Sequence, residues 1–318
     1  MSQKVFKIRL GLLVDSLYVP SWIDNLLNYL QNDPRFEIVL VIENGSFTKS
    51  GRSSVIYRLL RKIDTYLMKL PYSPFSRKKL YIPNASHTIA FPQKKKYSDY
   101  FPPEIIQVVK DNHIDFLLRF GFRIIRGEML KAAQYGILSL HHGDTSEYRG
   151  GPPAFWEVVN RAPVTAVTLQ LLTEKLDAGT ILDKCYLKTD ITSFHRNQHK
   201  LYWAGEQLFR DVLKKMADRG ILDYLESIRQ NDFGEQNGFL FKNPGNFRSF
   251  QLLIKFGFDT FRRASFQKFR FDQWCLLYSL QNGKKINDYE VIKPPRDRIY
   301  ADPFVVSEGG LFYLFFEE

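Results

Sequence analysis

The chain begins with an alternation of strand and helix patterns that restricts it to a parallel α/β sheet. Residues 8–15 and 37–43 are short apolar runs of the kind that form buried strands. Between them, Ser21 is a suitable N-cap for a helix whose apolar residues recur at helical spacing, namely Trp22, Leu26, Leu27 and Leu30. A strand–helix–strand unit joins parallel strands through a right-handed crossover. The sequence therefore predicts an α/β protein.

The turn after the first predicted strand argues against one class of enzyme. Residues 14–20 read Val-Asp-Ser-Leu-Tyr-Val-Pro and contain no glycine. Dinucleotide-binding folds need glycines at this turn, because only glycine lets the backbone approach the pyrophosphate closely. We therefore do not expect a nicotinamide-dependent enzyme.

Composition predicts a globular protein without disulfides. With 318 residues, 44% of them hydrophobic, the chain is long enough for two domains with real cores. Cys185 and Cys275 are its only cysteines, too few for a disulfide framework or a Cys-rich zinc site, so we expect a reducing, cytoplasmic setting. The N-terminus has scattered charges rather than the pattern of a signal peptide. No stretch reaches the roughly 20 apolar residues of a membrane span.

Positive charge is concentrated in two segments. Lysine and arginine number 45 against 34 acidic residues, a formal net charge of +11. The excess lies in residues 49–79, continued by 94–96, and in residues 242–270. Such segments attract phosphates, folate glutamates, nucleic acid or an acidic membrane, although solvated helix faces give the same pattern. Residues 54–70 form a predicted amphipathic basic helix. Packing on the protein body is the favoured interpretation, with docking on a membrane surface as the alternative.

The segment 136–182, which follows a predicted helix over residues 127–134, holds the candidate chemistry. An apolar strand ends in His141, a polar loop follows, and Asp177 returns in an Asp-Ala-Gly turn. Open α/β sheets bind ligands at the carboxyl ends of strands, so we expect His141 and Asp177 to meet at one edge. An imidazole can shuttle a proton, and a carboxylate can orient it or relay the proton. His142 is expected to point away from His141, because neighbouring side chains alternate along a strand.

The same segment resembles the formyltransferases that use 10-formyltetrahydrofolate. The family pattern is Asn-x-His at a strand end, Tyr-Arg-Gly, a helix, a Thr-Gly-Val-Thr strand and Asp-x-Gly-x-Ile-Leu. This chain matches it in order with residues 139–141, 148–150, 154–160, 165–168 and 177–182, and more weakly at 116–122 with a strand-plus-Gly element. The resemblance implies a Rossmann-like parallel sheet of the formyltransferase type. It also implies formyl transfer from 10-formyltetrahydrofolate, as co-substrate, to an amine.

The resemblance also implies roles for particular residues. The catalytic group that it implies is His141, Asp177 and Ser139. The residues expected to form the folate pocket are Phe120, Gly121, Phe122, His142, Gly143, Asp144 and Leu176. Those expected on the substrate side are Arg149, Gly150 and Trp156. The glycine-free first turn argues against glycinamide ribonucleotide as the substrate. No metal is expected, because neither compact ligand spacing nor a cysteine accompanies the polar groups, and His195 and His199 lack the Glu of a catalytic zinc motif.

Two departures from the family pattern leave alternatives open. Ser139 stands where the family has Asn, and residues 142–146 replace Ser-Leu-Leu-Pro. Asn offers a rigid amide donor to a developing oxyanion, whereas Ser is shorter and rotates freely. One alternative is thus a formyltransferase-like domain without folate chemistry that binds or modifies a glycan or other small molecule. A second is an enzyme that acts on nucleic acid, like methionyl-tRNA formyltransferase, although the basic segments lack regularly spaced stacking aromatics.

The predicted domain organisation is a formyltransferase-like α/β domain over 1–235, a basic helical linker over 236–272 that contains a Phe-rich helix over 247–263, and a β-rich segment over 273–318. Asn282-Gly283 and Gly309-Gly310 are hairpin signals between apolar runs. The last segment resembles the first blade of a glycosidase-like five-bladed β-propeller. A single blade cannot bury its faces, so we expect the chain to be a truncated piece.

The resemblance to a glycosidase-like blade associates the chain with carbohydrates. It favours an amino sugar or anionic nucleotide sugar, in glycan biosynthesis, as the acceptor. The oligomeric state is left open.

Overall fold

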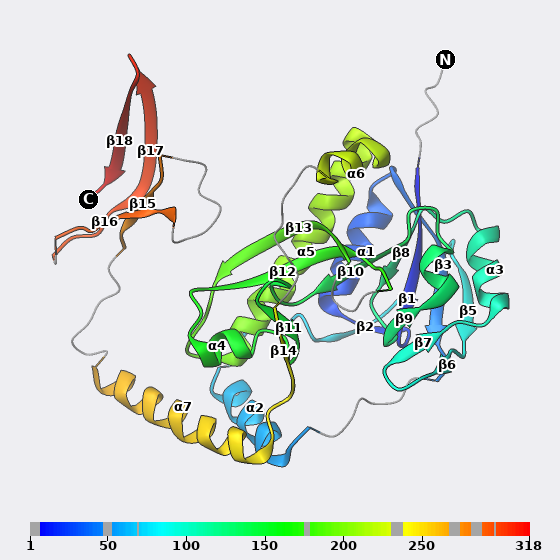
Figure 1. Ribbon diagram of the computed structural model, residues 1–318, viewed down its shortest axis with the longest axis horizontal. Helices are drawn as coiled ribbons and strands as arrows, with labels where there is room; N and C mark the ends of the chain where they lie inside the picture. The colour runs from blue at the N-terminus through cyan, green and yellow to red at the C-terminus, as the bar shows by residue number, and fades with distance from the viewer. Residues whose placement is uncertain are drawn as a thin grey trace. The chain divides into compact units, whose positions relative to one another are not determined.

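The computed structural model describes residues 7–46, 53–68, 70–174, 179–229, 238–266, 274–280, 288–295 and 297–318 (Figure 1). The chain divides into two compact units, Met1–Ile254 and Lys255–Glu318. Among the described helices, none is long and apolar enough to cross a membrane.

The first unit is built on a seven-stranded sheet, in agreement with the predicted α/β class. The strand order is β13-β12-β10-β8-β1-β3-β5, with bounds Thr180–Lys188, Val164–Leu171, Ile137–His141, Phe116–Arg119, Ile8–Val14, Phe36–Asn44 and Ser86–Ala90. The strands from β10 to β5 are parallel. β12 and β13 are antiparallel, so one edge of the sheet departs from the parallel arrangement.

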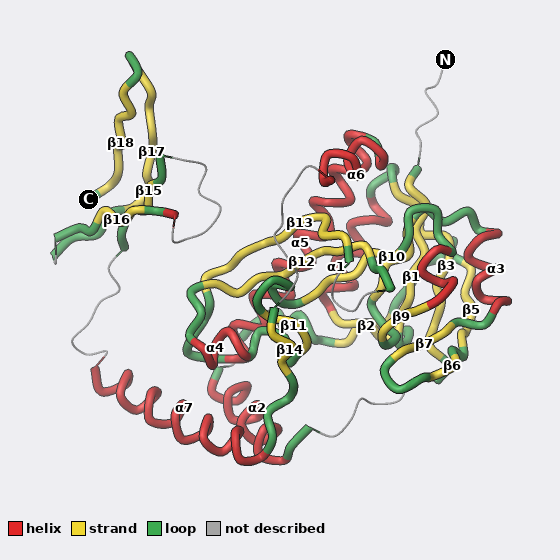
Figure 2. Tube along the Cα trace, in the orientation of Figure 1, coloured by secondary structure: helices red, strands yellow, loops and turns green. Residues whose placement is uncertain are grey.

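Helices cover both faces of this sheet, as Figure 1 and Figure 2 show. One face packs against α1 (Ser21–Asn32), α5 (Phe194–Arg219) and α6 (Ile221–Arg229), and the other against α3 (Pro103–Asp111) and the 3-10 turn η1 (Gly127–Lys131). Side chains of each strand alternate between the two cores. Leu118 belongs to the first core and Leu117 to the second, and both are fully buried.

The helix predicted over residues 127–134 is shorter than expected. Only Gly127–Lys131 is helical, as a 3-10 turn. The backbone N–H groups of Gln134 and Tyr135 instead donate to the carbonyls of Ile114 and Asp115, just before β8. Tertiary hydrogen bonds therefore end the helix, because they align the chain for entry into β10.

Smaller elements connect the main ones. β2 (Tyr18–Pro20) pairs with β4 (Arg77–Lys79), and a three-stranded sheet joins β6 (Gln93–Lys94), β7 (Ser98–Tyr100) and β9 (Ile124–Arg126). β11 (Tyr148–Gly150) pairs with β14 (Phe239–Phe241), and the short helix α4 (Trp156–Asn160) follows β11. α2 (Val55–Leu67) confirms the predicted helix over 54–70, with Ser54 as its N-cap.

The second unit contains two hairpin-like sheets. β15 (Leu276–Tyr278) pairs with β16 (Glu290–Ile292), and β17 (Ala301–Glu308) with β18 (Leu311–Glu317). Gly309 and Gly310 both have positive φ, +60° and +80°, as the predicted tight turn requires. The predicted Asn282-Gly283 turn lies outside the described residues. α7 (Asn246–Phe266) confirms the predicted basic helix over 247–263 and spans the boundary between the units.

Candidate functional site

Several of the predicted site residues belong to the ends of β8 and β10 or to the loops that follow them, and these strands run beside β1 in the sheet (Figure 1). These strands are parallel, with β8 between the other two, so their carboxyl ends share one edge of the sheet. Asp15 follows β1, Arg119 ends β8 and His141 ends β10. Three polar groups therefore meet this edge from three segments of the chain.

A polar row crosses the sheet at this edge. Ser139 pairs with Arg119 on β8 and with Gln170 on β12. Paired residues on adjacent strands project to the same face, so the three side chains are neighbours. Ser139 and Gln170 are 2% and 4% exposed, which places this row in a largely water-excluded environment.

Arg119 ties two strands together through its guanidinium. Nη1 donates to Ser139 Oγ at 3.1 Å, and Nη2 donates to the carbonyls of Phe122 and Arg123 at 3.0 and 2.9 Å. Because the Ser139 hydroxyl accepts from Arg119, its own proton remains for donation to another group. Sequence reasoning did not assign a role to Arg119. The sequence signal that could have identified Arg119 is a single charged residue at the end of an apolar strand.

Gln170 is a second residue that sequence reasoning missed. Its side-chain oxygen Oε1 is buried and has no hydrogen-bond partner among the described residues. A buried amide oxygen without a partner is costly in a protein interior. The unsatisfied oxygen beside Ser139 is therefore a candidate acceptor for a hydrogen bond from a ligand.

The loop after β8 fits tightly on the end of β1. Asp15 Oδ1 accepts from the backbone N–H of Phe122 at 2.7 Å and from Asn44 Nδ2 at 3.1 Å. A Cβ on Gly121 would lie 2.3 Å from the backbone nitrogen of Asp15, so only glycine fits. Of the predicted folate-pocket residues here, Phe122 is buried against Phe101, and Phe120 contacts Trp22 edge-on at 5.6 Å.

His141 is oriented by the loop that follows it. Its Nε2 lies 3.0 Å from the carbonyl oxygen of Tyr148. A carbonyl only accepts, so Nε2 carries the proton of this hydrogen bond. A Cβ on Gly143 would lie 2.7 Å from the same oxygen and 3.1 Å from His141 Nε2. Glycine at position 143 thus allows the contact that fixes the imidazole.

His142 points into the protein core, away from His141, as the alternation predicted. Its ring stacks on Tyr202 with centroids 3.9 Å apart and contacts Trp22 edge-on. Burial, with a smaller effect from His141, lowers the pKa of His142 to about 3. The ring is therefore neutral at physiological pH, and its visible role is packing.

Asp144 organises the loop through a buried ion pair. Lys184 Nζ lies 2.7 Å from Oδ1, and Tyr186 donates to Oδ2 at 3.2 Å. Burial alone would raise the pKa of Asp144, but hydrogen bonds from Lys184 and Ser146 bring the pKa below its ordinary value. Lys184 and Tyr186 face the same side of β13. Sequence reasoning missed both residues. Their only sequence signal is that they are two positions apart in a strand and therefore share a face.

The predicted substrate-side residues lie on β11 and α4. Gly150 has φ of +82°, and a Cβ there would lie 2.3 Å from the carbonyl oxygen of Phe241 on β14. Trp156 Nε1 donates to the carbonyls of Gly151 and Lys242, both at 3.1 Å, and the indole stacks on Phe241. Trp156 and Gly150 therefore hold β14 beside β11, the strand that contains Arg149.

Glu157 adds a titratable group next to this strand. The residue is 3% exposed, and burial raises the pKa of its carboxyl to about 7. Burial also raises the pKa of Tyr148, with Glu157 contributing to the shift. A carboxyl with this pKa can exchange a proton at neutral pH, which makes Glu157 an acid–base candidate.

Two predicted site residues, Asp177 and Leu176, lie outside the described residues. The meeting of His141 with Asp177 therefore stays a prediction. The described ends of this turn are close together, because Leu171 pairs with Thr180 and a Cβ on Gly179 would lie 2.3 Å from the Leu171 carbonyl oxygen.

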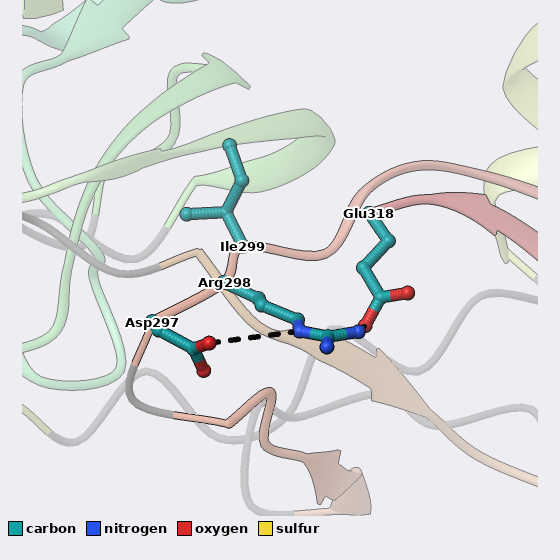
Figure 3. A pocket seen from close by; sticks show the side chains of 4 residues that line it. All are labelled: Asp297, Arg298, Ile299 and Glu318. Atoms are coloured by element: carbon teal, nitrogen blue, oxygen red, sulfur yellow. Dashed lines mark hydrogen bonds and ion pairs between the residues drawn. The ribbon is translucent and has the colours of Figure 1, made fainter.

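A metal-binding cluster and a surface pocket are two other features that can mark a functional site. Among the described residues, no group of three or more His, Cys, Asp or Glu side chains could hold a metal ion. A pocket of about 590 Å³ in the second unit is lined by Asp297, Arg298, Ile299 and Glu318 (Figure 3). It is built around an exposed Arg298–Glu318 ion pair and includes none of the predicted site residues.

The chain is similar in sequence to methionyl-tRNA formyltransferases. It is 27% identical over 118 residues to the enzyme of Acetivibrio thermocellus, covering 36% of this chain and 38% of the relative. Identity to the Bacillus thuringiensis enzyme is 32% over 114 residues, covering 36% and 35%. The chain thus spans just over a third of the length of these relatives. No protein-family model matches it. The sequence similarities support a relationship to the formyltransferases, in line with the motif resemblance.

Solved structures with similar folds have lower sequence identity. Glycinamide ribonucleotide transformylase 1 from Geobacillus kaustophilus is 15% identical, with a TM-score of 0.47, covering 66% of this chain and 99% of that chain. An N-formyltransferase from Helicobacter canadensis in complex with folinic acid and dTDP-3-aminofucose is 16% identical, with a TM-score of 0.38, covering 69% and 65%.

Proposed function

We propose that the protein transfers a formyl group from 10-formyltetrahydrofolate to an amine on an amino sugar or anionic sugar nucleotide. The observation that supports this proposal most directly is the row of Arg119, Ser139 and Gln170 beside His141 at the carboxyl edge of the sheet. The motif resemblance and the sequence similarity to formyltransferases point to the same chemistry.

Formyl transfer needs a donor to the oxyanion that develops at the formyl oxygen and an acceptor for the proton that leaves the amine. Ser139 keeps a hydroxyl proton to donate, because its oxygen accepts from Arg119. The neighbouring Gln170 Oε1 is buried without a partner among the described residues, so it is proposed to accept a hydrogen bond from an N–H group of the bound folate or acceptor. The Ser139 hydroxyl is proposed to replace the family Asn as the donor, with Gln170 holding the ligand beside it.

The proposed proton acceptor is His141. The Tyr148 carbonyl holds the proton of Nε2, so in the neutral ring Nδ1 is the basic nitrogen. Asp177 is proposed as the carboxylate that orients the imidazole or relays the proton. Arg149, Gly150 and Trp156 are proposed to face the acceptor, while Phe120, Gly121, Gly143, Asp144 and Leu176 shape the folate side.

A second acceptor has a specific observation in its favour. The relatives that match in sequence are methionyl-tRNA formyltransferases, so the amine of methionyl-tRNA belongs in the same test. The net charge of +11 suits either an anionic sugar nucleotide or tRNA.

The test is to incubate the protein with 10-formyltetrahydrofolate and a panel of amino-sugar nucleotides and methionyl-tRNA, and to follow release of tetrahydrofolate. We expect turnover with an amino-sugar nucleotide and a roughly thousandfold loss in kcat for His141→Ala. Ser139→Ala and Gln170→Ala should each lose roughly a hundredfold. His87→Ala, a change at an exposed histidine paired with Glu43, is the matched control.

Replacement of Ser139 by Asn distinguishes the proposal from a domain that has lost folate chemistry. A gain in rate would mark Ser139 as a weaker donor within conserved chemistry, whereas a loss would mark a site built around Ser139 and Gln170. The proposal fails if no amine supports turnover and calorimetry detects no folate binding.

A further inference from the structure

Helix α2 has an apolar stripe that the protein body does not cover. Tyr57 and Leu60 are 8% and 3% exposed and pack inward. The residues on the adjoining arc of the helix are apolar and solvent-exposed, between 38% and 73%: Val55, Leu59, Ile63, Tyr66 and Leu67. They recur at i, i+4, i+8, i+11 and i+12, so they form one stripe along the helix. Packing in the core accounts for Tyr57 and Leu60, but it does not account for the exposed apolar stripe.

The start of α7 has the same character and contacts α2. Its residues Phe247, Phe250 and Ile254 are 75%, 49% and 58% exposed, while Ser249 and Leu252 are buried. Asn246 Oδ1 accepts from the backbone N–H of Ile56, and the Ser54 and Ser249 hydroxyls lie 3.3 Å apart. α2 and the start of α7 therefore lie side by side (Figure 1).

The charges around these stripes have one sign. Arg58 and Lys62 on α2 and Arg248 on α7 are exposed. Asp64 is the only acidic residue within 53–68 and 238–254, and it accepts from the backbone N–H of His195. We call the eight exposed apolar side chains and these three cations the α2–α7 surface. A row of apolar groups flanked by cations matches the boundary between lipid headgroups and acyl chains.

We propose that the α2–α7 surface docks on an anionic lipid bilayer, with its apolar side chains in the interface and its cations on lipid phosphates. Charge complementarity favours this occupant over a second copy of the chain. In a symmetric dimer through this surface, two copies of the same cationic patch would face each other, so charges of one sign would be brought together. The inference is independent of the proposed formyl transfer.

The test is flotation of the full chain with phosphatidylcholine vesicles, with and without phosphatidylglycerol. We expect binding only to the anionic vesicles, weakening as salt is raised. Arg58→Glu with Lys62→Glu should reduce the partition coefficient roughly tenfold or more. Leu59→Asn with Phe250→Asn should also reduce it, because apolar insertion is lost.

Matched controls use exposed residues elsewhere in the first unit. Lys110→Glu with Lys214→Glu reverses the same number of charges, and Leu222→Asn removes an apolar side chain that is 60% exposed. Both should bind vesicles like the unaltered protein, and circular dichroism checks that every variant is folded. The proposal is overturned if the protein does not float, if both sets of variants bind equally, or if light scattering shows a dimer that Leu59→Asn with Phe250→Asn dissociates.

Discussion

The site edge of the central sheet and the β17–β18 hairpin are both made of apolar strands, yet their side chains have opposite surroundings. In β8, Phe116, Leu117 and Leu118 are fully buried, because helices pack on both faces of the sheet. In β18, Phe312 and Phe315 are 71% and 57% exposed. Strand-forming residues are thus sufficient for pairing, but burial depends on what covers each face.

This difference extends to the polar groups of the two regions. The Lys184 and Asp144 side chains are 5% and 14% exposed, so their ion pair is poorly screened by water. The Arg298 and Glu318 side chains are about half exposed, and solvent screens their ion pair strongly. Polar groups at the sheet edge can therefore perturb pKa values and bind a ligand strongly, whereas similar groups on the hairpin contribute little.

The largest effect is expected where backbone segments meet at the sheet edge. Gly121→Ala places a Cβ 2.3 Å from the Asp15 nitrogen, and a backbone atom cannot move aside cheaply. We expect a loss of about 3 kcal/mol in the free energy of unfolding, measured by urea denaturation. Gly245→Ala, with no atom within 4 Å of the added Cβ, is the control and should change stability by less than about 0.5 kcal/mol. Equal effects of the two changes would show that the edge is not tightly packed.

A smaller effect is expected at the buried ion pair. Lys184→Met leaves Asp144 with its hydrogen bonds from Ser146 and Tyr186 but without a cation, and should cost about 2 kcal/mol at pH 7. Because the folded-state pKa of Asp144 is lowered, its contribution to stability is present above the unfolded pKa of about 3.9 and is lost as pH falls through the folded pKa. The difference from the unaltered protein should therefore shrink between pH 7 and pH 3 in urea denaturation.

The control for this change is Lys215→Met, which breaks the more exposed pair with Asp183. It should cost at most about 1 kcal/mol. A pH-independent loss in Lys184→Met would mean that lost packing of the lysine stem, rather than its charge, stabilises the loop.

The smallest effect is expected on the hairpin. Phe312→Ser removes a side chain that is already 71% exposed. The free energy of unfolding, measured by thermal denaturation, should therefore change by less than about 0.5 kcal/mol. A loss above about 1 kcal/mol would mean that this strand is covered in solution and would remove the contrast between the two regions.

Local patterns predicted several of the main strands and helices. The apolar periods of residues 8–15 and 37–43 predicted β1 and β3, and the alternation along β10 predicted that His142 points away from His141. The helix predicted over 127–134 was too long, because hydrogen bonds from Gln134 and Tyr135 to residues before β8 are tertiary and leave no local signal.

The sequence by itself determined the α/β class, the strand that ends in His141 and the glycines of the site loops, because these depend on spacing and steric demands within short segments. Only the tertiary structure decided that Arg119, Ser139 and Gln170 form one row, and that Lys184 compensates Asp144. Those contacts depend on the pairing register of strands far apart in the chain. A shift of one residue would turn each side chain to the opposite face of the sheet.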